Sequence, residues 1–237
     1  MRKSRAWAAA LGIAAALSMA MSGQAAAQPG TPDIIGGGTV GSAPWGAQIY
    51  WDNVSNFGGF ECSGSIVAAQ WVLTAQHCLN SPGMHVRVGN VNLGQGVLVA
   101  VNQQVASPVG DMGLLHLASP VSTTFMTLAS SAPPVNSTNQ IYGWGRTLNQ
   151  SPPSPVLKTA NVRVTGTSRD AFGGTAIASR GINGAAWHGD SGGPEIFNGQ
   201  QVGVCSTGNN SGSNPQGTQN YASVAANRSW IRSTAGV

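Results

Sequence analysis

The sequence predicts an all-β protein made of two β units, with one helix at the C-terminal end. Only 8% of the 237 residues are charged, and 33 residues are glycine. Few charges and many glycines suit short strands and tight turns better than long surface helices. Short apolar or alternating runs recur between turn residues, which is typical of barrels and sandwiches. The runs expected to be strands are 47–51, 65–67, 72–75, 85–88, 97–105, 112–117, 140–144, 158–164, 176–178, 202–205 and 219–224.

A segment rich in Ser, Thr and Pro, residues 121–135, divides these runs into two halves of similar size. We expect it to connect the two β units, so that residues 34–124 form the first and residues 125–237 the second. Only residues 224–233, near the end of the chain, have helical character. The second unit is therefore expected to finish in a terminal helix.

The N-terminus has the features of a secretory signal peptide. Three basic residues, Arg2, Lys3 and Arg5, precede the apolar run 6–20, and Ala25–Ala27 provides a small-residue cleavage site. The alternative is a membrane anchor, but the apolar run is shorter than the ~20 residues that a membrane span needs. Residues 1–27 are expected to be removed, which leaves a secreted, extracellular protein without a membrane segment.

Removal of this segment also removes most of the apparent positive charge. The full chain has eleven Lys and Arg against seven Asp and Glu, and three of those basic residues lie in residues 1–27. Eight basic and seven acidic residues remain, a net charge of +1. No basic patch is left to indicate nucleic-acid binding.

Three cysteines in a secreted chain allow one disulfide and one leftover thiol. Cys62 and Cys78 flank two apolar runs, 65–68 and 71–74, and a bridge between them would close a hairpin-like unit. A loop of this size is stabilised by ~3 kcal/mol in the chain-entropy model. Cys205 lies in a run that resembles a buried strand, so we interpret it as a small core residue.

The segment Gly189–Pro194 is the strongest candidate for chemistry. A serine between glycines, Ser191, sits on a tight turn that exposes its Oγ and lets neighbouring N–H groups converge, as an oxyanion site requires. An ordinary Gly/Ser turn is the alternative. The segment also fits the G-x-S-x-G pattern of α/β-hydrolases, whose histidine follows the serine. That fold is excluded because the four histidines, His77, His85, His116 and His188, all precede Ser191.

The general base is therefore expected upstream of the serine. His77 ends an apolar run and adjoins Cys78, which would anchor the imidazole at the end of a strand. His85 and His116 alternate with apolar residues and are interpreted as ordinary strand residues. His188 is close in sequence to Ser191 and could line a pocket.

The third catalytic group must be a buried carboxylate that orients the imidazole and stabilises the imidazolium. Asp111 opens the apolar run 112–117, a position where burial is expected. The order His77, Asp111, Ser191 is one of the known triad orders. No metal or cofactor is expected, because the sequence has no C-x-x-C, no H-E-x-x-H, no P-loop and no dinucleotide fingerprint.

Together these segments resemble the chymotrypsin/trypsin family of serine proteases. Residues 73–78, Leu-Thr-Ala-Gln-His-Cys, are similar to its L-T-A-A-H-C motif, with one Gln for Ala. Residues 111–117 resemble D-[IM]-[AG]-L-L-x-L, and residues 189–194 are identical to G-D-S-G-G-P. The small number of cysteines resembles bacterial secreted members more than animal ones. Further similarities lie at Ile34-Ile35-Gly36-Gly37, Gly143-Trp144-Gly145 and Ser229-Trp230-Ile231.

The resemblance implies two six-stranded antiparallel β-barrels with the active site in the cleft between them. It implies that His77 is general base and then acid, that Asp111 orients it, and that Ser191 is the nucleophile. The N–H groups of Gly189 and Ser191 would form the oxyanion hole.

The resemblance also implies a zymogen. In the family, cleavage before the Ile-[VI]-Gly-Gly segment frees an α-amino group, which pairs with the aspartate preceding the nucleophile. Here these groups would be Ile34 and Asp190, with residues 28–33 as a short propeptide. The residue directly before Ile34 is Asp33 and not Lys or Arg, so trypsin-like self-activation is not expected.

For the substrate pocket, the resemblance places Ala185 at the floor, where trypsin-like members carry Asp. Alanine cannot pair with Lys or Arg, so small or medium apolar P1 side chains are expected. Ser206, Thr207 and Gly208 would form one wall and a strand edge for the substrate backbone. Gln219 or its neighbours would form another wall and narrow the pocket. His188, which lies just before the serine turn, is expected to line the pocket as well.

The sequence as a whole indicates a secreted serine endopeptidase that works through an acyl-enzyme. Polypeptide substrates and protein protease inhibitors are the expected partners, and a monomer is the expected state. The alternatives are a catalytically silent homologue used for binding, or an esterase on the same fold. All three triad residues are present, which favours the enzyme.

Overall fold

The computed structural model describes residues 34–80 and 83–237. Its first barrel is closed from six antiparallel strands in the spatial order β3-β4-β5-β8-β7-β6. Along β6 the residues alternate between buried and partly exposed, as expected for a strand with one face in a barrel core. The strands are β3 (Gly46–Trp51), β4 (Phe60–Ala68), β5 (Trp71–Thr74), β6 (Met84–Val88), β7 (Val97–Ala106) and β8 (Gly113–Leu117), with the 3₁₀ turns η1 (Asn56–Gly59) and η2 (Gln76–Cys78) between them.

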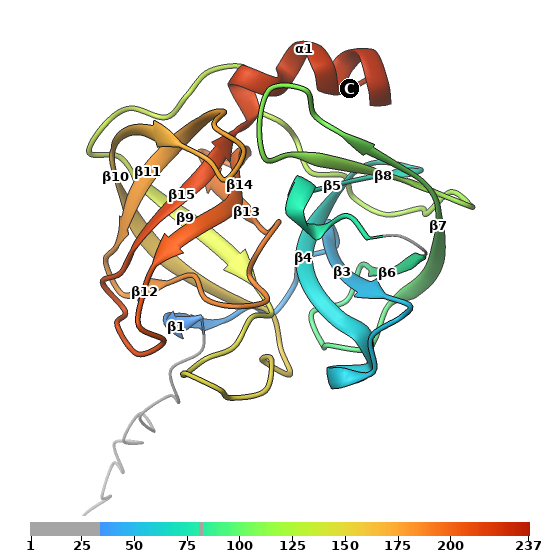
Figure 1. The fold of residues 1–237 in the computed structure, drawn as a ribbon, viewed down its shortest axis with the longest axis horizontal. Helices are drawn as coiled ribbons and strands as arrows, with labels where there is room; N and C mark the ends of the chain where they lie inside the picture. The colour runs from blue at the N-terminus through green and yellow to red at the C-terminus, as the bar shows by residue number, and fades with distance from the viewer. Residues whose placement is uncertain (1–33, 81–82) are drawn as a thin grey trace, which may run out of the picture.

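The second barrel lies beside the first (Figure 1). Its sheet has the order β11-β15-β14-β13-β9-β10-β2, and a further β10–β11 pairing closes six of these strands into a barrel. A two-stranded sheet, β1–β12, adds the start of the described chain to this barrel. The strands are β1 (Ile35–Gly36), β2 (Gly38–Thr39), β9 (Thr138–Gly143), β10 (Lys158–Arg169), β11 (Thr175–Gly181), β12 (Gly184–Ala185), β13 (Pro194–Phe197), β14 (Gln200–Asn209) and β15 (Thr218–Ser223).

The two six-stranded barrels and the terminal helix confirm the predicted fold. Four strands have no counterpart among the predicted runs: β1, β2, β12 and β13. Three of them contain only two residues, too short for a detectable alternation, and β13 begins at Pro194. The predicted signal peptide and propeptide, residues 1–33, lie outside the described residues.

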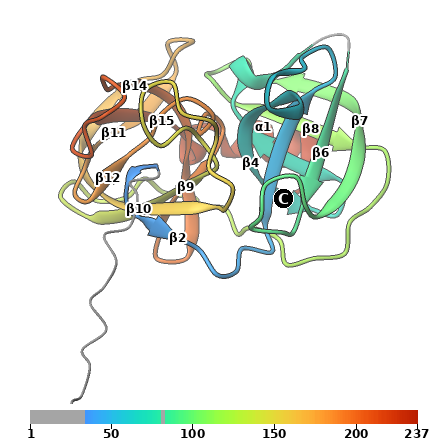
Figure 2. The ribbon, with the colours of Figure 1, turned by 90° about the horizontal axis from the view of Figure 1, so that it is seen from below.

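The terminal helix α1 (Val224–Ala235) follows the last strand of the second barrel and packs on the first. Ser223 caps it by accepting a hydrogen bond from Ala226 N–H at 3.3 Å. Val224 and Ile231 are buried in the core of the first barrel, so the chain ends by tying the two barrels together. Figure 2 shows α1 behind the first barrel. In the described part of the chain, no helix has the length and apolarity to cross a membrane.

Side chains also join the barrels across their interface. Ser65 on β4 donates a buried hydrogen bond of 2.6 Å to Gln201 Oε1 on β14. Val204 and Ala222, both from the second barrel, belong to the same apolar cluster as the core of the first. The relative position of the barrels is therefore fixed by packed and hydrogen-bonded contacts, which a site built from both requires.

Candidate active site

His77 and Asp111 meet at the end of the first barrel. His77 lies in the 3₁₀ turn η2, directly after β5, and Asp111 lies just before β8, the neighbour of β5. His77 Nδ1 is 2.7 Å from Asp111 Oδ2, and the backbone N–H of His77 donates to Oδ1 at 3.0 Å. Because Asp111 is fully buried, its carboxylate fixes both the orientation of the ring and the tautomer with the proton on Nδ1.

A disulfide holds the turn that carries His77. Cys62 on β4 and Cys78 in η2 are bonded, with their Cα atoms 6.2 Å apart. Ligand-type atoms of Cys62, His77 and Cys78 lie within 4.8 Å of one another, but the two sulfurs are bonded to each other and are not thiolate ligands.

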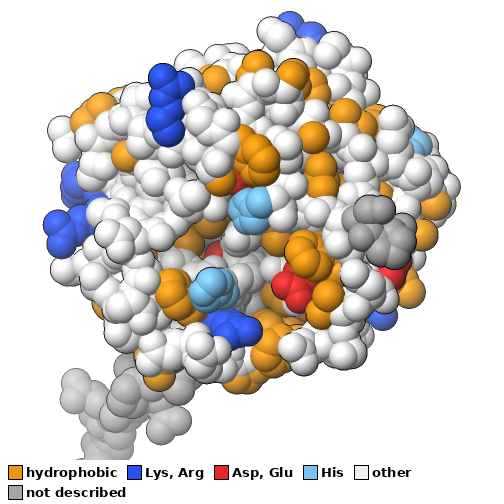
Figure 3. All heavy atoms as spheres, in the orientation of Figure 1, with side chains coloured by type: hydrophobic (Ala, Val, Ile, Leu, Met, Phe, Trp, Pro, Cys, Tyr) orange, Lys and Arg blue, Asp and Glu red, His pale blue; other side chains and the backbone are white. Residues whose placement is uncertain are grey.

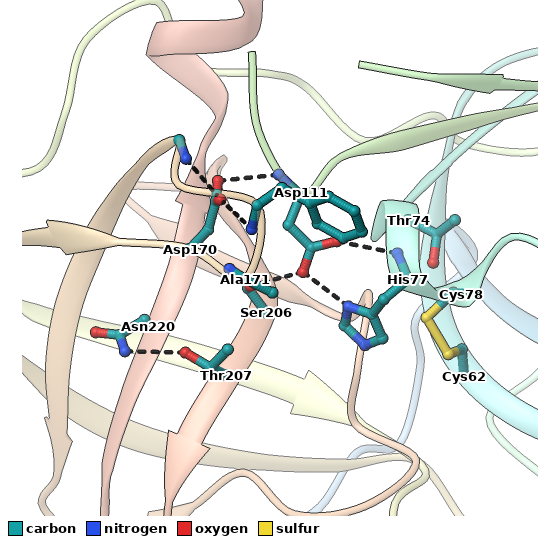
Figure 4. A network of polar contacts seen from close by, with 12 residues as sticks. Cys62, Thr74, His77, Cys78, Asp111, Asp170, Ala171, Ser206, Thr207 and Asn220 are labelled. Atoms are coloured by element: carbon teal, nitrogen blue, oxygen red, sulfur yellow. Dashed lines mark hydrogen bonds and ion pairs between the residues drawn. A yellow bond between two sulfur atoms is a disulfide. The ribbon is translucent and has the colours of Figure 1, made fainter. Parts of the chain in front are cut away.

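Ser206, from the second barrel, completes the surroundings of Asp111. Its hydroxyl donates to Asp111 Oδ2 at 2.6 Å, so this oxygen interacts with both His77 and Ser206 (Figure 4). Burial alone would raise the pKa of Asp111, but the hydrogen bonds from His77 and Ser206 and the charge of His77 lower it below its ordinary value. Asp111 is therefore held as a carboxylate.

The loop 189–193 presents Ser191 between the barrels. Ser191 and His77 line the same cavity, about 360 Å³ in volume, together with Glu61, Arg146 and His188. Figure 3 shows a hollow on this face, with histidine side chains beside it. No hydrogen bond joins the described side chains of Ser191 and His77; in free enzymes this contact is often long and tightens when substrate binds.

Two N–H groups of this loop, those of Gly189 and Ser191, have no hydrogen-bond acceptor among the described residues. The peptide before Gly189 is fixed because Arg146 N–H donates to the His188 carbonyl at 2.7 Å. The peptide before Ser191 is fixed because Gly193 N–H donates to the Asp190 carbonyl at 2.9 Å. In a trans peptide the N–H points opposite to the carbonyl, and neither N–H has an acceptor among residues 34–80 and 83–237. They are available to a substrate oxygen.

Glycine is required at two positions of this loop. Gly189 has φ +95° and Gly192 has φ +78°, values that other residues rarely adopt. A Cβ on Gly192 would also collide with Thr74 Oγ1 and the Ser63 carbonyl, both from the first barrel. The predicted Gly-rich turn is therefore needed for backbone conformation and for close contact between the barrels.

A second cavity of about 190 Å³ adjoins Ser191. Four of the predicted pocket residues line it: His188, Ser206, Thr207 and Gly208. Thr207 accepts a hydrogen bond from Asn220 Nδ2 at 2.9 Å, which fixes this wall (Figure 4). The rest of the lining, which the sequence did not indicate, is Ala186, Trp187 and Cys205.

The other two predicted pocket residues lie behind the lining. Ala185 is 1% exposed and pairs with Ile35 in the β1–β12 sheet. Gln219 is 2% exposed, and its Oε1 accepts a hydrogen bond of 2.8 Å from Ala186 N–H. Gln219 thus supports one of the lining residues from below.

Comparison with known protein families shows which family has this fold and these motifs. The family model described as Trypsin matches residues 34–231. The chain belongs to the trypsin family. Serine protease SP24D of Anopheles gambiae is 30% identical over 239 residues, covering 85% of this chain and 87% of the relative. Trypsin delta of Drosophila erecta is 34% identical over 227 residues, covering 84% and 87%.

A solved structure supports the fold of this trypsin-family chain. Neuropsin, a serine protease expressed in the limbic system of mouse brain, matches with a TM-score of 0.70 and 24% identity, covering 81% of this chain and 94% of that one. The relatives named here come from insects, so the predicted likeness to bacterial secreted members stays a prediction.

Asp190 occupies a buried position in this trypsin-family chain. It is 1% exposed, and its oxygens accept N–H hydrogen bonds from Gly145 and Trp187, both at 2.8 Å. Burial raises the pKa of Asp190 to about 7, although both hydrogen bonds oppose the shift. A Cβ on Gly143 or Gly145 would collide with this carboxylate, which explains the glycines that flank Trp144.

Besides part of the lining of the second cavity, sequence reasoning missed two residues that hold the backbone of the site in this trypsin-family chain. Ser63 on β4 binds the serine loop twice: its N–H donates to the Ser191 carbonyl at 2.8 Å and its hydroxyl to the Gly189 carbonyl at 2.9 Å. Asp170 accepts the backbone N–H of Asp111 at 3.0 Å. Neither lies in a motif, and a long-range hydrogen bond leaves no periodic pattern in a single sequence.

Proposed function

We propose that this protein is a secreted serine endopeptidase that cleaves peptide bonds through an acyl-enzyme. Ser191 Oγ attacks the carbonyl carbon of the scissile bond while His77 Nε2 takes the hydroxyl proton. The oxygen of the tetrahedral intermediate accepts hydrogen bonds from Gly189 and Ser191 N–H. The C–N bond then breaks, and His77 returns the proton to the leaving amine. Water, deprotonated by His77, hydrolyses the ester and restores Ser191.

The observation that carries the proposal is the contact between His77 Nδ1 and Asp111 Oδ2, 2.7 Å long, beside a cavity that Ser191 lines. It leaves Nε2 as the basic nitrogen of the imidazole. An ionised, buried Asp111 stabilises the imidazolium that forms during attack. The two free N–H groups of the serine loop support the oxyanion role, since preorganised donors act without reorganisation at the moment of reaction.

The cavity next to Ser191 supports small or medium apolar P1 side chains. Its volume of about 190 Å³ is modest, and its described lining contains no Asp or Glu. A Lys or Arg side chain would therefore enter without an ionic partner and would pay the cost of an unpaired buried charge. Ala185 and Gln219 act from behind the lining.

Activation by cleavage before Ile34 is supported by the backbone at this residue. Ile34 is 1% exposed and has φ +40°, a value that a β-branched residue rarely adopts. Cleavage of the Asp33–Ile34 bond removes the preceding carbonyl and with it this strain. The new ammonium would pair with Asp190, lower its raised pKa and stabilise the serine loop. Because the residue directly before Ile34 is Asp33 and not Lys or Arg, another protease or other processing makes the cut.

The same proposal includes secretion after removal of residues 1–27, polypeptide substrates, protein inhibitors as partners, and a monomeric state. The division at residues 124 and 125 is proposed for the two barrels, although the strands β1 and β2 pair with strands of the second barrel. Intact-mass measurement of the secreted chain tests the processing steps: a chain that begins at Ile34 supports both cleavages.

Labelling with a fluorophosphonate tests the proposed function directly. Mature protein should be labelled at Ser191, and Ser191→Ala should not. Absence of label in protein that begins at Ile34 would instead support a silent binding homologue. A peptide-library digest then separates peptidase from esterase activity and gives the P1 preference; dominant cleavage after Lys or Arg would contradict the pocket proposed above.

A further inference from the structure

A hairpin of the second barrel reaches the backbone of Asp111. Residues 170–174, here called the hairpin tip, connect β10 to β11. Asp170 Oδ2 accepts the backbone N–H of Asp111 at 3.0 Å, and Asp170 is only 6% exposed (Figure 4). The hairpin tip therefore contacts Asp111, the residue that orients His77, and it does so on the side of Asp111 away from His77.

The backbone around Asp111 creates the need for this partner. Met112 N–H donates to the Gly110 carbonyl at 2.8 Å, so Asp111 is the central residue of a three-residue turn. Its own N–H points out of the turn and takes no part in the β5–β8 ladder, which begins at Gly113. A buried N–H without an acceptor is costly, and Asp170 provides the acceptor.

A carboxylate suits this position because it accepts hydrogen bonds on both oxygens. While Oδ2 binds Asp111, Oδ1 accepts N–H groups of the hairpin tip itself, from Phe172 at 3.0 Å and Gly174 at 2.8 Å. The same side chain thus shapes the tip and attaches it to Asp111. An asparagine has only one oxygen and could serve one of these groups of donors well.

The hairpin tip acts on Asp111 by a second route. Ala171 N–H donates to Ser206 Oγ at 3.0 Å, and Ser206 donates to Asp111 Oδ2 at 2.6 Å. Because Ser206 Oγ accepts from Ala171, its single proton is directed toward the carboxylate. One side of Asp111 is therefore held at its backbone and at its carboxylate by the same short turn.

Two glycines allow the close approach. A Cβ on Gly110 would collide with Asp170 Oδ2, and a Cβ on Gly174 would collide with the Val109 carbonyl and the Gly110 Cα. The two chain segments therefore lie close enough for the Asp170 carboxylate to reach the Asp111 N–H, and a side chain at either glycine would prevent this.

We infer that Asp170 is a positioning residue for Asp111, and through it for His77. The inference rests on the proposed peptidase function. Asp170 does not touch substrate; it fixes the place of the carboxylate that holds the imidazole. Small displacements of catalytic groups have large effects on rate, so loss of this attachment should lower the chemical step more than substrate binding.

The test compares Asp170→Ala and Asp170→Asn with Thr175→Ala, an exposed substitution on the same hairpin. Rates are measured per active site titrated with a fluorophosphonate. Asp170→Ala should lower kcat about 10-fold with little change in KM. The kcat of Asp170→Asn should lie between the kcat of Asp170→Ala and that of wild type. Thr175→Ala should keep the wild-type values.

The pH profile separates positioning from a purely structural effect. The acidic limb of kcat/KM reports protonation of the base in the free enzyme. It should move to lower pH in both Asp170 variants, because an Asp111 that is no longer held in place stabilises the imidazolium less. The other titratable side chains that line the cleft, Glu61, Arg146 and His188, are the same in all variants.

Two outcomes would overturn the inference. One is that kcat per site and the acidic limb of both Asp170 variants equal those of Thr175→Ala; the other is that only the number of titratable sites falls. If Asp170→Ala does not fold, the comparison of Asp170→Asn with Thr175→Ala decides. Wild-type protein without a titratable serine would contradict the proposed function itself, which distinguishes the two failures.

Discussion

Ser63, on a strand of the first barrel, donates its backbone N–H to the carbonyl of Ser191, in a loop of the second barrel, at 2.8 Å. Its hydroxyl donates to the Gly189 carbonyl at 2.9 Å and accepts Trp144 N–H at 3.1 Å. The serine loop is thus held from the opposite barrel at both of its predicted oxyanion-hole residues. Its conformation depends on the way the two barrels are packed together.

Ser63→Ala should therefore reduce catalysis more than folding. The substitution keeps the backbone hydrogen bond to Ser191 but removes the hydroxyl that binds the Gly189 carbonyl and Trp144 N–H. We expect kcat per titrated site to fall roughly 10-fold, less than the direct loss of an oxyanion donor, because the donors themselves remain. Steady-state kinetics on a peptide substrate, normalised by active-site titration, measures this.

Ser65→Ala is the matched control, two residues along the same strand. It removes another buried hydrogen bond between the barrels, the 2.6 Å contact with Gln201 Oε1. Leaving that oxygen unpaired should cost about 1–3 kcal/mol of unfolding free energy. Activity per titrated site should stay at the wild-type value. If both variants lost activity equally, the specific role of Ser63 in the serine loop would be refuted.

Substitutions at Gly208 should narrow, step by step, the cavity that we propose to bind the P1 side chain. Gly208 lines this cavity, and a Cβ there would come no closer than 3.5 Å to any described atom outside Gly208 and its two chain neighbours, so a side chain is tolerated. We expect Gly208→Ala and then Gly208→Val to reduce kcat/KM for medium apolar P1 residues progressively, while Ala at P1 is still cleaved. Kinetics on a series of substrates differing only at P1 measures the effect; equal losses for every P1 residue would contradict it.

Much of the fold was predictable because its causes are local. The run Met84–Val88 alternates buried and partly exposed residues, and the same alternation is visible in its sequence. The helix Val224–Ala235 begins after a capping serine, Ser223. The two-residue strands β1, β2 and β12 were not predictable, because they are defined by partners far away in the chain.

The residues of the candidate site show the same difference between local patterns and distant partners. His77, Asp111 and Ser191 stand in motifs that the family resemblance identifies, and the structure brings His77 and Asp111 into direct contact. Ser63 and Asp170 act on this site through hydrogen bonds with partners 59 or more residues away along the chain. Only the folded structure shows such partners, since neither a serine on a strand nor an aspartate in a turn is unusual in itself.

The Cys62–Cys78 disulfide should contribute strongly to stability. It closes a loop with a sequence separation of 16 and joins β4 to the turn that carries His77. The double substitution of both cysteines by alanine should lower the unfolding free energy by ~3 kcal/mol, or Tm by roughly 6–12 °C. The measurement is thermal unfolding of the chain with and without the disulfide. Both chains carry Ser191→Ala, so that self-digestion does not affect the result. A loss below about 1 kcal/mol would contradict this estimate.

Glu195 is a buried acid in the second barrel. It is fully buried; Oε1 accepts a hydrogen bond of 2.8 Å from Asn139 Nδ2, and Oε2 has no partner among the described residues. Burial raises the pKa of Glu195 from 4.5 to about 8, although the Asn139 hydrogen bond opposes the shift. Glu195 is therefore mostly protonated at neutral pH in the folded protein, whereas the same group is ionised when the chain unfolds.

The sign of the resulting pH dependence follows from this difference. Between pH 4.5 and about 8 the folded state binds more protons at Glu195 than the unfolded state, so stability falls as the pH rises. The contribution of Glu195 is fully present below pH 4.5, and the loss up to pH 8 is on the order of 5 kcal/mol. Glu195→Gln cannot ionise and should lack this component. Denaturant unfolding of the proteins with Glu195 and with Gln at this position, both in the Ser191→Ala background, isolates this component between pH 4.5 and about 8. If the unfolding free energies of the two proteins changed in parallel with pH, Glu195 would already be ionised in the folded state.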